Sequence, residues 1–528
     1  MVSTKYLAFP DELLVAVFLE LDVDSIIACQ KTCKRFQHII EDSVHVQYHV
    51  ELQLACMKNG PNSDTSTASR LSMLRAQRRA WAALSWSTPE PVVLPTPPGV
   101  TKWKLCIRLP SPIRGIEQRE WRIDHTCGEN DLKWDFCHDP SQDLLVLFEE
   151  FKISDEEESH SAFKIHFLAI STGTLHPAAT SPVLLYAPKF RYCDINVSLT
   201  LQVCGQHLAM AMEDNDCKEQ PKFVIWDWVS GLTKMEISYD FNHSFQSFSL
   251  LPDNLVLVGA ARYIEELKHD VHLSVYDLGQ TAHSGSYTLT DVDDCSYVCR
   301  LRFDPELSDE DIFISSMPLP LDEHMALDNE GVERASPFML APEAQLIVVY
   351  LGACWTSTRV FFPVSAIMKH VSSTRRSGAS GIDVPWCDWG LSSRVFVDSF
   401  RNVGSGNVWQ RDSTRGLRFA TVLNRILSNE DWVRREFYEV VAITDFNPLA
   451  HTARSGLGKV WTRPQPESER WEAKFRASWR EEDQHSRWWD SCLLGEDLIV
   501  LVSESWHRGQ IFAVMTLKEP AEEPTSAA

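Results

Sequence analysis

Cysteine and histidine lie close enough to share a metal ion at two places, His125 with Cys127 and Cys137 with His138. A structural zinc site needs a second pair clustered with the first to complete four ligands, and neither pair has one. The acidic run at 155–158 lacks the alternating ligands and the glycine of a calcium loop. We therefore expect no metal site, and the acidic run is typical of a solvated hairpin loop.

Signatures of catalysis are missing as well. The 528 residues contain no HExxH, no GxSxG and no phosphate-binding GxxxxGK followed by Ser or Thr. The glycine pairs Gly404/Gly406 and Gly456/Gly458 lack the third glycine and the acidic residue of a dinucleotide site. The sequence thus predicts no catalytic residue and no cofactor, and it favours a protein that is not an enzyme.

The charge balance argues against nucleic acid as a partner. The chain has 73 acidic and 50 basic side chains, for a formal net charge of −23, which repels a phosphate backbone unless a basic face is segregated. The one basic cluster, formed by Arg70, Arg75, Arg78 and Arg79, falls in a stretch of helical spacing. We expect it to be a solvated helix face.

The expected compartment is the cytoplasm, the nucleus or both. No apolar stretch approaches the roughly 18 residues that a membrane-spanning helix needs, and charge interrupts the N-terminus where a signal peptide would be apolar. The 14 cysteines form no disulfide framework and no CxxC pair, which predicts reduced thiols. The glycosylation sequons at Asn196 and Asn242 then have no role.

Helix signals dominate the first fifty residues. Pro10, Asp11 and Glu12 suit the first turn of a helix, and apolar residues follow on one face at Leu13, Leu14, Val17, Phe18 and Leu21. A second start at 22–25 leads into further periodic apolar residues as far as Ile40. No glycine or proline divides this second group, so it could form one helix or two.

Such a small helical unit rarely has a sufficient core of its own. A binding partner could complete it, and Phe9 supports this because a large apolar side chain at a helix start needs a surface to pack on. A plain three-helix bundle packed on its own chain explains the periodicity equally well.

The order of residues 9–36 resembles the F-box pattern. Phe9-Pro10-Asp11-Glu12-Leu13-Leu14, then Phe18 and Leu21, then Ile26-Ile27, then Cys33-Lys34-Arg35-Phe36 follow Leu-Pro-x-Glu-Leu-Leu, Ile-Phe, Leu-Leu and Val-Cys-Lys-Arg-Trp in type and spacing. Phe9 replaces the usual leucine, and Thr32 replaces the usual valine. The resemblance covers residues 7 to about 45.

The resemblance implies docking onto the Skp-family adaptor of a cullin and RING ubiquitin ligase. The adaptor-facing side chains it implies are Phe9, Pro10, Leu13, Leu14, Phe18, Leu21, Ile26 and Ile27. The side chains expected to pack inside the module are Val17, Cys33, Phe36 and Ile40.

Four segments are expected along the chain: the F-box module at 7–50, a connector at 51–130, a β-rich domain at 131–517 and a disordered tail at 518–528. Polar residues at 58–69 and prolines at 88–99 are typical of a flexible loop and an extended segment. The overall fold class is therefore α+β, with a small three-helix unit and a large all-β domain.

The β-rich region repeats one sequence pattern. A tight turn leads into an apolar strand, and a later strand ends in an aromatic residue and an aspartate, as in Ile225-Trp226-Asp227 and Val275-Tyr276-Asp277, and less clearly at Phe396-Val397-Asp398. This resembles the Trp-Asp element of WD-type propeller blades, and the length suits about seven to nine blades. A pair of β-sandwiches is the alternative, because the strand spacing alone would fit it too.

Several tryptophans in the C-terminal part could anchor a partner on the surface of the β-rich domain, although packing between sheets is the commoner role. The candidates are Trp461, Trp471, Trp479, Trp488 and Trp489.

The leading hypothesis is a substrate receptor of an SCF-type ligase, which binds the adaptor through the F-box and a target protein, of unknown identity, through the β-rich domain. One alternative is an F-box scaffold that acts outside ubiquitination. A propeller enzyme with a fused helical module is a third hypothesis.

Overall fold

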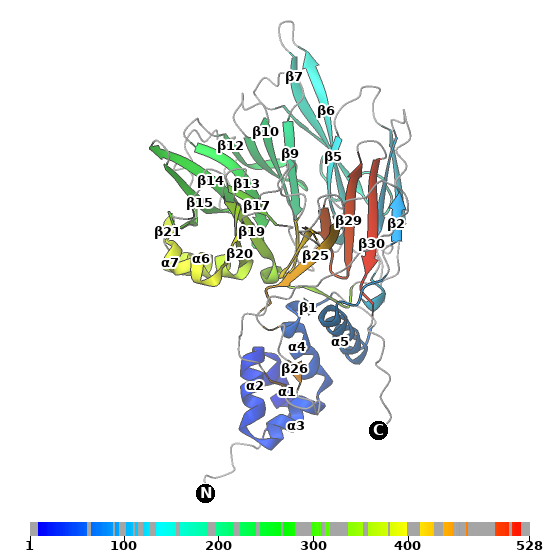
Figure 1. Ribbon diagram of the computed structural model, residues 1–528, viewed down its shortest axis with the longest axis vertical. Helices are drawn as coiled ribbons and strands as arrows, with labels where there is room; N and C mark the ends of the chain where they lie inside the picture. The colour runs from blue at the N-terminus through cyan, green and yellow to red at the C-terminus, as the bar shows by residue number, and fades with distance from the viewer. Residues whose placement is uncertain are drawn as a thin grey trace.

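The computed structural model describes residues 9–60, 65–87, 90–93, 102–108, 111–114, 120–126, 134–154, 159–187, 197–214, 222–238, 243–265, 268–279, 297–305, 307, 312–316, 336–351, 357–378, 381–398, 412–426, 437–447, 449, 453–454, 461–462, 491–505 and 509–518. A helical foot, residues 9–54, projects from a larger β-body (Figure 1).

Four helices build the foot: α1 (Asp11–Leu19), α2 (Val23–Thr32), α3 (Lys34–Asp42) and α4 (Val44–Leu54). The last three begin at side-chain caps, because Asp22, Cys33 and Ser43 each accept the backbone N–H three residues further on. Cys33 is extended, with φ −155° and ψ 157°. The apolar run that the sequence left as one helix or two is therefore two helices.

The foot has a core of its own, and α4 completes it. Ile26 and Ile40, from α2 and α3, are fully buried together with Val46 and Val50 of α4. The three helices expected from the sequence thus pack on a fourth that belongs to the same chain. This closes the inner side of the module without a partner.

The segment expected to be a connector carries paired strands and a packed helix. α5 (Thr67–Ala83) lies against α4. The strands of this segment are β1 (Met57–Asn59), which pairs with β18 (Phe338–Leu340), β2 (Glu90–Val93), which pairs with β30 (Gly509–Thr516), and β3 (Lys102–Arg108), which pairs with β4 (Glu120–Thr126).

Six sheets of three or more strands, antiparallel except for one added strand, lie in the described part of the β-body. Their strands are β5 (Trp134–Asp139), β6 (Leu144–Ser154), β7 (Ser159–Ala169) and β8 (Val183–Tyr186); β9 (Val197–Cys204), β10 (His207–Asp214), β11 (Lys222–Asp227) and β12 (Leu232–Ser238); β13 (His243–Leu251), β14 (Leu255–Glu265), β15 (Lys268–Asp277) and β16 (Cys299–Arg302); β17 (Ile312–Ser315), β19 (Leu346–Leu351), β20 (Ser357–Pro363) and β22 (Arg394–Asp398); β23 (Asp412–Arg415), β24 (Arg418–Ile426) and β25 (Phe437–Asp445); and β28 (Ser491–Leu494), β29 (Leu498–Ser505), β30 and β2.

Smaller elements fill in around the sheets. β21 (Ile382–Val384) adds to β16 as a parallel fifth strand, and α6 (Val364–Ser377) and α7 (Trp386–Trp389) lie on either side of it in the chain. The others are η2 (Pro112–Arg114), η3 (Pro140–Gln142), η5 (Pro342–Ala344), η6 (Gly390–Ser392), β26 (Ala453–Arg454) and β27 (Trp461–Thr462).

One backbone hydrogen bond recurs in all six sheets. The N–H of the residue after the third strand donates to the carbonyl of the residue before the second strand, at 2.8–3.0 Å. The pairs are Ile170 to Asp143, Trp228 to Gln206, Leu278 to Asn254, Val364 to Gln345, Phe446 to Leu417 and Leu517 to Asp497. The sheets are therefore copies of one structural unit, as the repeated sequence pattern predicts.

The sheets are arranged as in a propeller. The first strands of successive sheets are neighbours, β5 beside β9, β9 beside β13 and β13 beside β17, and the remaining strands extend outward (Figure 1). The early strand β2 forms the outer edge of the last sheet through β30, so the two ends of the β-body meet in one sheet. The β-body is propeller-like, and the sandwich alternative is wrong because its sheets would stack in pairs.

Aspartates brace the turns after third strands, as the Trp-Asp pattern predicts. The Asp227 carboxylate accepts the N–H groups of Val229 and Ser230, both at 3.1 Å, and Asp277 accepts that of Gly279 at 3.0 Å. The preceding aromatic residues, Trp226 and Tyr276, are buried. The side chain of Asp398, the third predicted instance, lies outside the described part of the structure.

We expect Asp227→Ala to lower the free energy of unfolding by about 1–2 kcal/mol, because two backbone N–H groups lose their charged acceptor. Differential scanning calorimetry should show a midpoint about 2–4 °C lower for the β-body. Glu343→Ala, at an exposed position, is the control and should leave the midpoint unchanged. Equal midpoints for the two variants would show that the brace contributes nothing.

Candidate functional site

One face of α1 is apolar and open to solvent. Phe9, Leu13 and Val17 are 60%, 53% and 54% exposed. Leu13 and Val17 are four residues apart, so they follow one another along one side of the helix, and Phe9 comes just before its N-cap. We call these three side chains the α1 stripe. Exposed apolar groups gathered in this way mark a surface for a partner.

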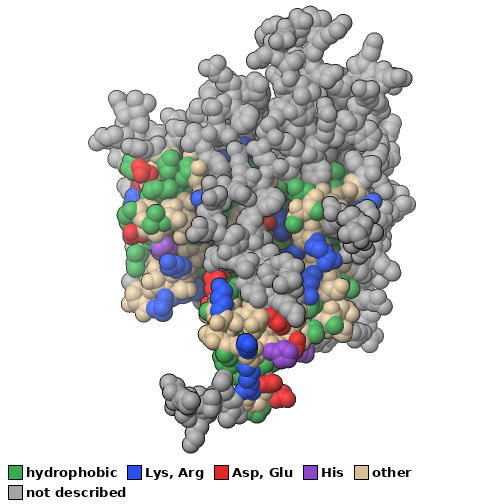
Figure 2. Space-filling view, turned by 60° about the horizontal axis from the view of Figure 1, so that its bottom comes forward, with side chains coloured by type: hydrophobic (Ala, Val, Ile, Leu, Met, Phe, Trp, Pro, Cys, Tyr) green, Lys and Arg blue, Asp and Glu red, His purple; other side chains and the backbone are tan. Residues whose placement is uncertain are grey.

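The foot projects away from the β-body, which leaves this surface accessible (Figure 1). Seen from below, the foot presents apolar side chains among basic and acidic ones (Figure 2). On α1 the stripe has Glu12 and Glu20, both exposed, on its flank. The surface is thus an apolar ridge with a charged rim, which is the usual make-up of a protein interface.

The eight side chains predicted to face an adaptor fall into three groups. Phe9, Pro10 and Leu13 are exposed, Leu14 and Leu21 are half-buried, and Phe18, Ile26 and Ile27 are buried in the core of the foot. The exposed and half-buried residues form a surface that a partner can reach, and the buried three support it from beneath. Contact of any of them with an adaptor stays a prediction.

Val17 does not lie where the sequence analysis expects it. It was assigned to internal packing, but it is exposed because Phe18, about 100° further round α1, takes the inward position. Ile40 is fully buried, whereas Cys33 and Phe36 are half-buried. The Phe36 ring meets the Phe18 ring edge-on at 5.5 Å between centroids.

Polar contacts from α3 and α4 fix both ends of α1. The Arg35 guanidinium donates to the Asp11 carboxylate at 2.5 Å and to the Phe9 carbonyl at 2.6 Å. At the other end, the Gln53 side chain donates to the Leu21 carbonyl at 3.0 Å and accepts the Val23 N–H at 2.6 Å. The sequence analysis gave neither residue a role, although Arg35 belongs to the motif that carries the F-box resemblance.

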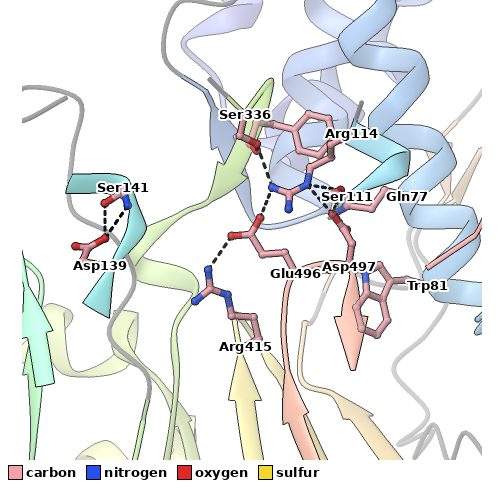
Figure 3. Close-up of polar contacts among 11 residues, drawn as sticks. Gln77, Trp81, Ser111, Arg114, Asp139, Ser141, Ser336, Arg415, Glu496 and Asp497 are labelled. Carbon is pink, nitrogen blue, oxygen red and sulfur yellow. Dashed lines mark hydrogen bonds and ion pairs between the residues drawn. The ribbon is translucent and has the colours of Figure 1, made fainter. Parts of the chain in front are cut away.

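A buried ionic network joins the foot side of the molecule to the β-body (Figure 3). The Arg114 guanidinium binds Glu496 at 2.5 Å and Asp497 at 2.6 Å, and Arg415 binds Glu496 at 2.9 Å. Burial opposes the charges of Arg114 and Glu496. Their mutual attraction still raises the pKa of Arg114 and, with Arg415, lowers the pKa of Glu496. Both side chains are therefore charged.

The carboxylate of Asp497 binds three side chains from separate parts of the chain. Besides Arg114 of η2, it accepts the amide of Gln77, on α5, at 2.5 Å and the hydroxyl of Ser111. The network thus links α5 and η2 to the turn between β28 and β29 (Figure 3). We call it the junction network.

The arginine cluster of α5 is not the solvated helix face that the sequence analysis expects. Arg75 and Arg78 are half-buried and bind Glu51 of α4, Arg75 at 3.0 Å. Arg70 donates to the Asn59 side chain at 2.6 Å. Two of the four arginines therefore attach α5 to the foot, and a third attaches it to β1. Arg79 is exposed.

The candidate metal ligands and surface tryptophans of the sequence form no site within the described ranges. Burial raises the pKa of the Cys137 thiol, so it is protonated. Within the described ranges no three His, Cys, Asp or Glu side chains gather as a metal site. Cys127 lies outside these ranges, as do four of the tryptophans proposed as anchors, and Trp461 falls in β27. The acidic run at 155–158 also lies outside them.

Residues 7–50 match the family model described as F-box-like. The chain therefore combines an N-terminal F-box-like module with a large propeller-like β domain. No curated protein sequence matches the chain significantly.

The solved structures that are similar to this chain include three at low identity. The WD40 domain of SCAP from fission yeast has 8% identity and a TM-score of 0.29, over 75% of this chain and 77% of its own. Drosophila Semaphorin 1a, extracellular domains 1-2, has 7% identity and a TM-score of 0.31, over 74% and 87%. The β-propeller domain of the Trilobed protease from Pyrococcus furiosus has 8% and 0.24, over 72% and 96%.

These TM-scores are low. The propeller-like architecture rests instead on the strand pairing and on the hydrogen bond that recurs in every sheet. In the part of the chain that the structure describes, no helix is long and apolar enough to cross a membrane.

Proposed function

We propose that the protein is the substrate-receptor subunit of an SCF-type ubiquitin ligase. The foot docks onto a Skp-family adaptor, which links it to a cullin and its RING subunit, and the β-body binds a target protein. No catalytic residue is needed in this chain, because holding the target near the recruited conjugating enzyme raises its effective concentration.

The observation that carries this proposal is the α1 stripe. Its side chains are more than half exposed although the foot already has a closed core. Each large apolar side chain buried by a partner contributes roughly 1.5–3 kcal/mol, so three of them can anchor an interface. The propeller-like body supports the second half of the proposal, since such domains offer broad protein-binding faces.

The double variant Leu13→Asp with Val17→Asp tests the docking. We expect its affinity for the adaptor to fall at least about a hundredfold, because two carboxylates would have to be desolvated in an apolar interface. Co-purification and calorimetric titration with the full chain measure this. The single change Leu14→Asp, which the sequence suggests, is less clean because Leu14 packs against the core of the foot.

The matched control is Leu185→Asp with Leu391→Asp, two exposed leucines of the β-body. It adds the same charges outside the foot and should bind the adaptor as the wild type does. An undiminished affinity of the α1 variant would contradict the proposal. Recovery of cullin along with the adaptor supports a ligase subunit, whereas recovery of adaptor alone supports a scaffold outside ubiquitination.

A further inference from the structure

The first turn of α1 lacks the usual means of holding a helix start. Pro10 occupies the N-cap position and makes no side-chain cap bond. Its carbonyl accepts the N–H groups of Leu13 and Leu14, at 3.2 and 3.3 Å. Phe9 and Leu13 point into solvent and so add little packing. A helix start of this kind frays readily.

Arg35, on α3, takes the place of the missing side-chain cap of α1. Its Nε and Nη2 atoms both reach Oδ1 of Asp11, at 3.1 and 2.5 Å, and Nη2 also reaches the carbonyl of Phe9 at 2.6 Å. The two acceptors lie on either side of Pro10, so one guanidinium holds the chain where it enters the helix. A lysine ammonium can donate to acceptors from one nitrogen, but it lacks the second donor, Nε, and the planar group that fixes the geometry at Asp11.

Gln53, on α4, holds the backbone that follows the C-terminal end of α1. Its amide binds the Leu21 carbonyl and the Val23 N–H, which lie on the two sides of the turn into α2. The stripe therefore sits on a helix that is tied down at both ends from other helices of the foot.

We propose that Arg35 and Gln53 are positioning residues that hold α1 in its docking conformation before the partner arrives. The inference rests on the proposed adaptor docking. Ordering a flexible segment at the moment of binding costs conformational entropy, and a segment that is already ordered avoids this cost. The two residues thus raise affinity without touching the partner.

The test compares full-length Arg35→Met, Arg35→Lys and Gln53→Met with the wild type. Titration with the Skp-family adaptor gives affinity, and amide hydrogen exchange reports order at Leu13 and Leu14 or at Val23. We expect Arg35→Met to bind about tenfold more weakly, in line with the loss of a charged hydrogen bond, and to exchange the Leu13 and Leu14 amides faster. Arg35→Lys should recover part of both effects.

Gln53→Met should weaken binding by a similar factor and accelerate exchange of the Val23 amide. Lys34→Met is the matched control, because Lys34 is the exposed neighbour of Arg35 on α3 and its loss removes the same charge. It should change neither affinity nor exchange.

Two results would overturn the inference. One is wild-type affinity in Arg35→Met. The other is weaker binding with unchanged exchange at Leu13 and Leu14, which would make Arg35 a direct contact. If the wild type itself fails to bind the adaptor, the proposed function fails, and the exchange rates still decide whether Arg35 orders the start of α1 and Gln53 the turn between α1 and α2.

Discussion

Replacing Asp497 with alanine is expected to lower the free energy of unfolding by about 3–5 kcal/mol, the cost of breaking a buried ion pair. The side chain is 1% exposed and binds Arg114 at 2.6 Å. Its removal takes one of two carboxylates from Arg114, which keeps Glu496, and it leaves the Gln77 amide and the Ser111 hydroxyl without their acceptor. These groups lie where α5 and η2 meet the β-body, so the loss acts on the attachment between them.

Limited proteolysis and calorimetry measure this effect. We expect cleavage between the foot and the β-body at protease levels that the wild type resists, together with a lower unfolding midpoint. Asp497→Asn keeps the shape of the side chain but loses its charge, so its protease resistance and unfolding midpoint should lie between those of the wild type and of Asp497→Ala. Asp42→Ala serves as the control because Asp42 is an exposed acid of the foot. Resistance equal to that of the wild type would mean that other contacts carry the attachment.

The junction network shows what the sequence could not reveal. Gln77 and Asp497 are 420 residues apart, and neither stands in a local pattern that points to the other. The turn before β29 follows the predicted pattern of a tight turn that leads into an apolar strand, but its contact with α5 depends on where the sheets lie relative to that helix. The same holds for β2, since pairing with β30 requires that the two ends of the β-body meet.

Local patterns did predict some of the elements. The spacing of apolar residues placed α1, and the aromatic-aspartate endings of β11 and β15 indicated braced turns that the hydrogen bonds of Asp227 and Asp277 confirm. The sequence left a break at Cys33 undetermined because its cap is a thiol, a weak acceptor that is not among the usual capping groups. Helix propensity left open whether this segment forms one helix or two, and the extended backbone at Cys33 divides it into two.

Periodicity also could not separate the α1 stripe from the core beneath it. Val17 and Phe18 are adjacent apolar residues, and which of them points inward depends on where α3 and α4 lie. The resemblance assigned Phe18 to the adaptor and Val17 to the interior, whereas the exposures are the reverse. A functional surface on a small helical unit is therefore defined by what the chain itself leaves uncovered.

Phe18→Ala separates these two interpretations. Phe18 is 2% exposed and packs edge-on against Phe36, and truncating a buried phenylalanine costs about 3–5 kcal/mol. A module of this size has little stability to spare, so we expect the foot to lose its fold. Adaptor binding should disappear together with the amide protection of Ile26, Ile40 and Val50, as measured by hydrogen exchange.

Leu13→Ala is the matched comparison on the same helix. Its side chain is mostly in solvent, so we expect a change in stability within about 0.5 kcal/mol, intact amide protection in the foot, and weaker adaptor binding. If Phe18→Ala instead keeps full protection and still fails to bind, Phe18 contacts the partner directly. The docking surface would then include a side chain that the free protein holds inside, and binding would require the foot to open.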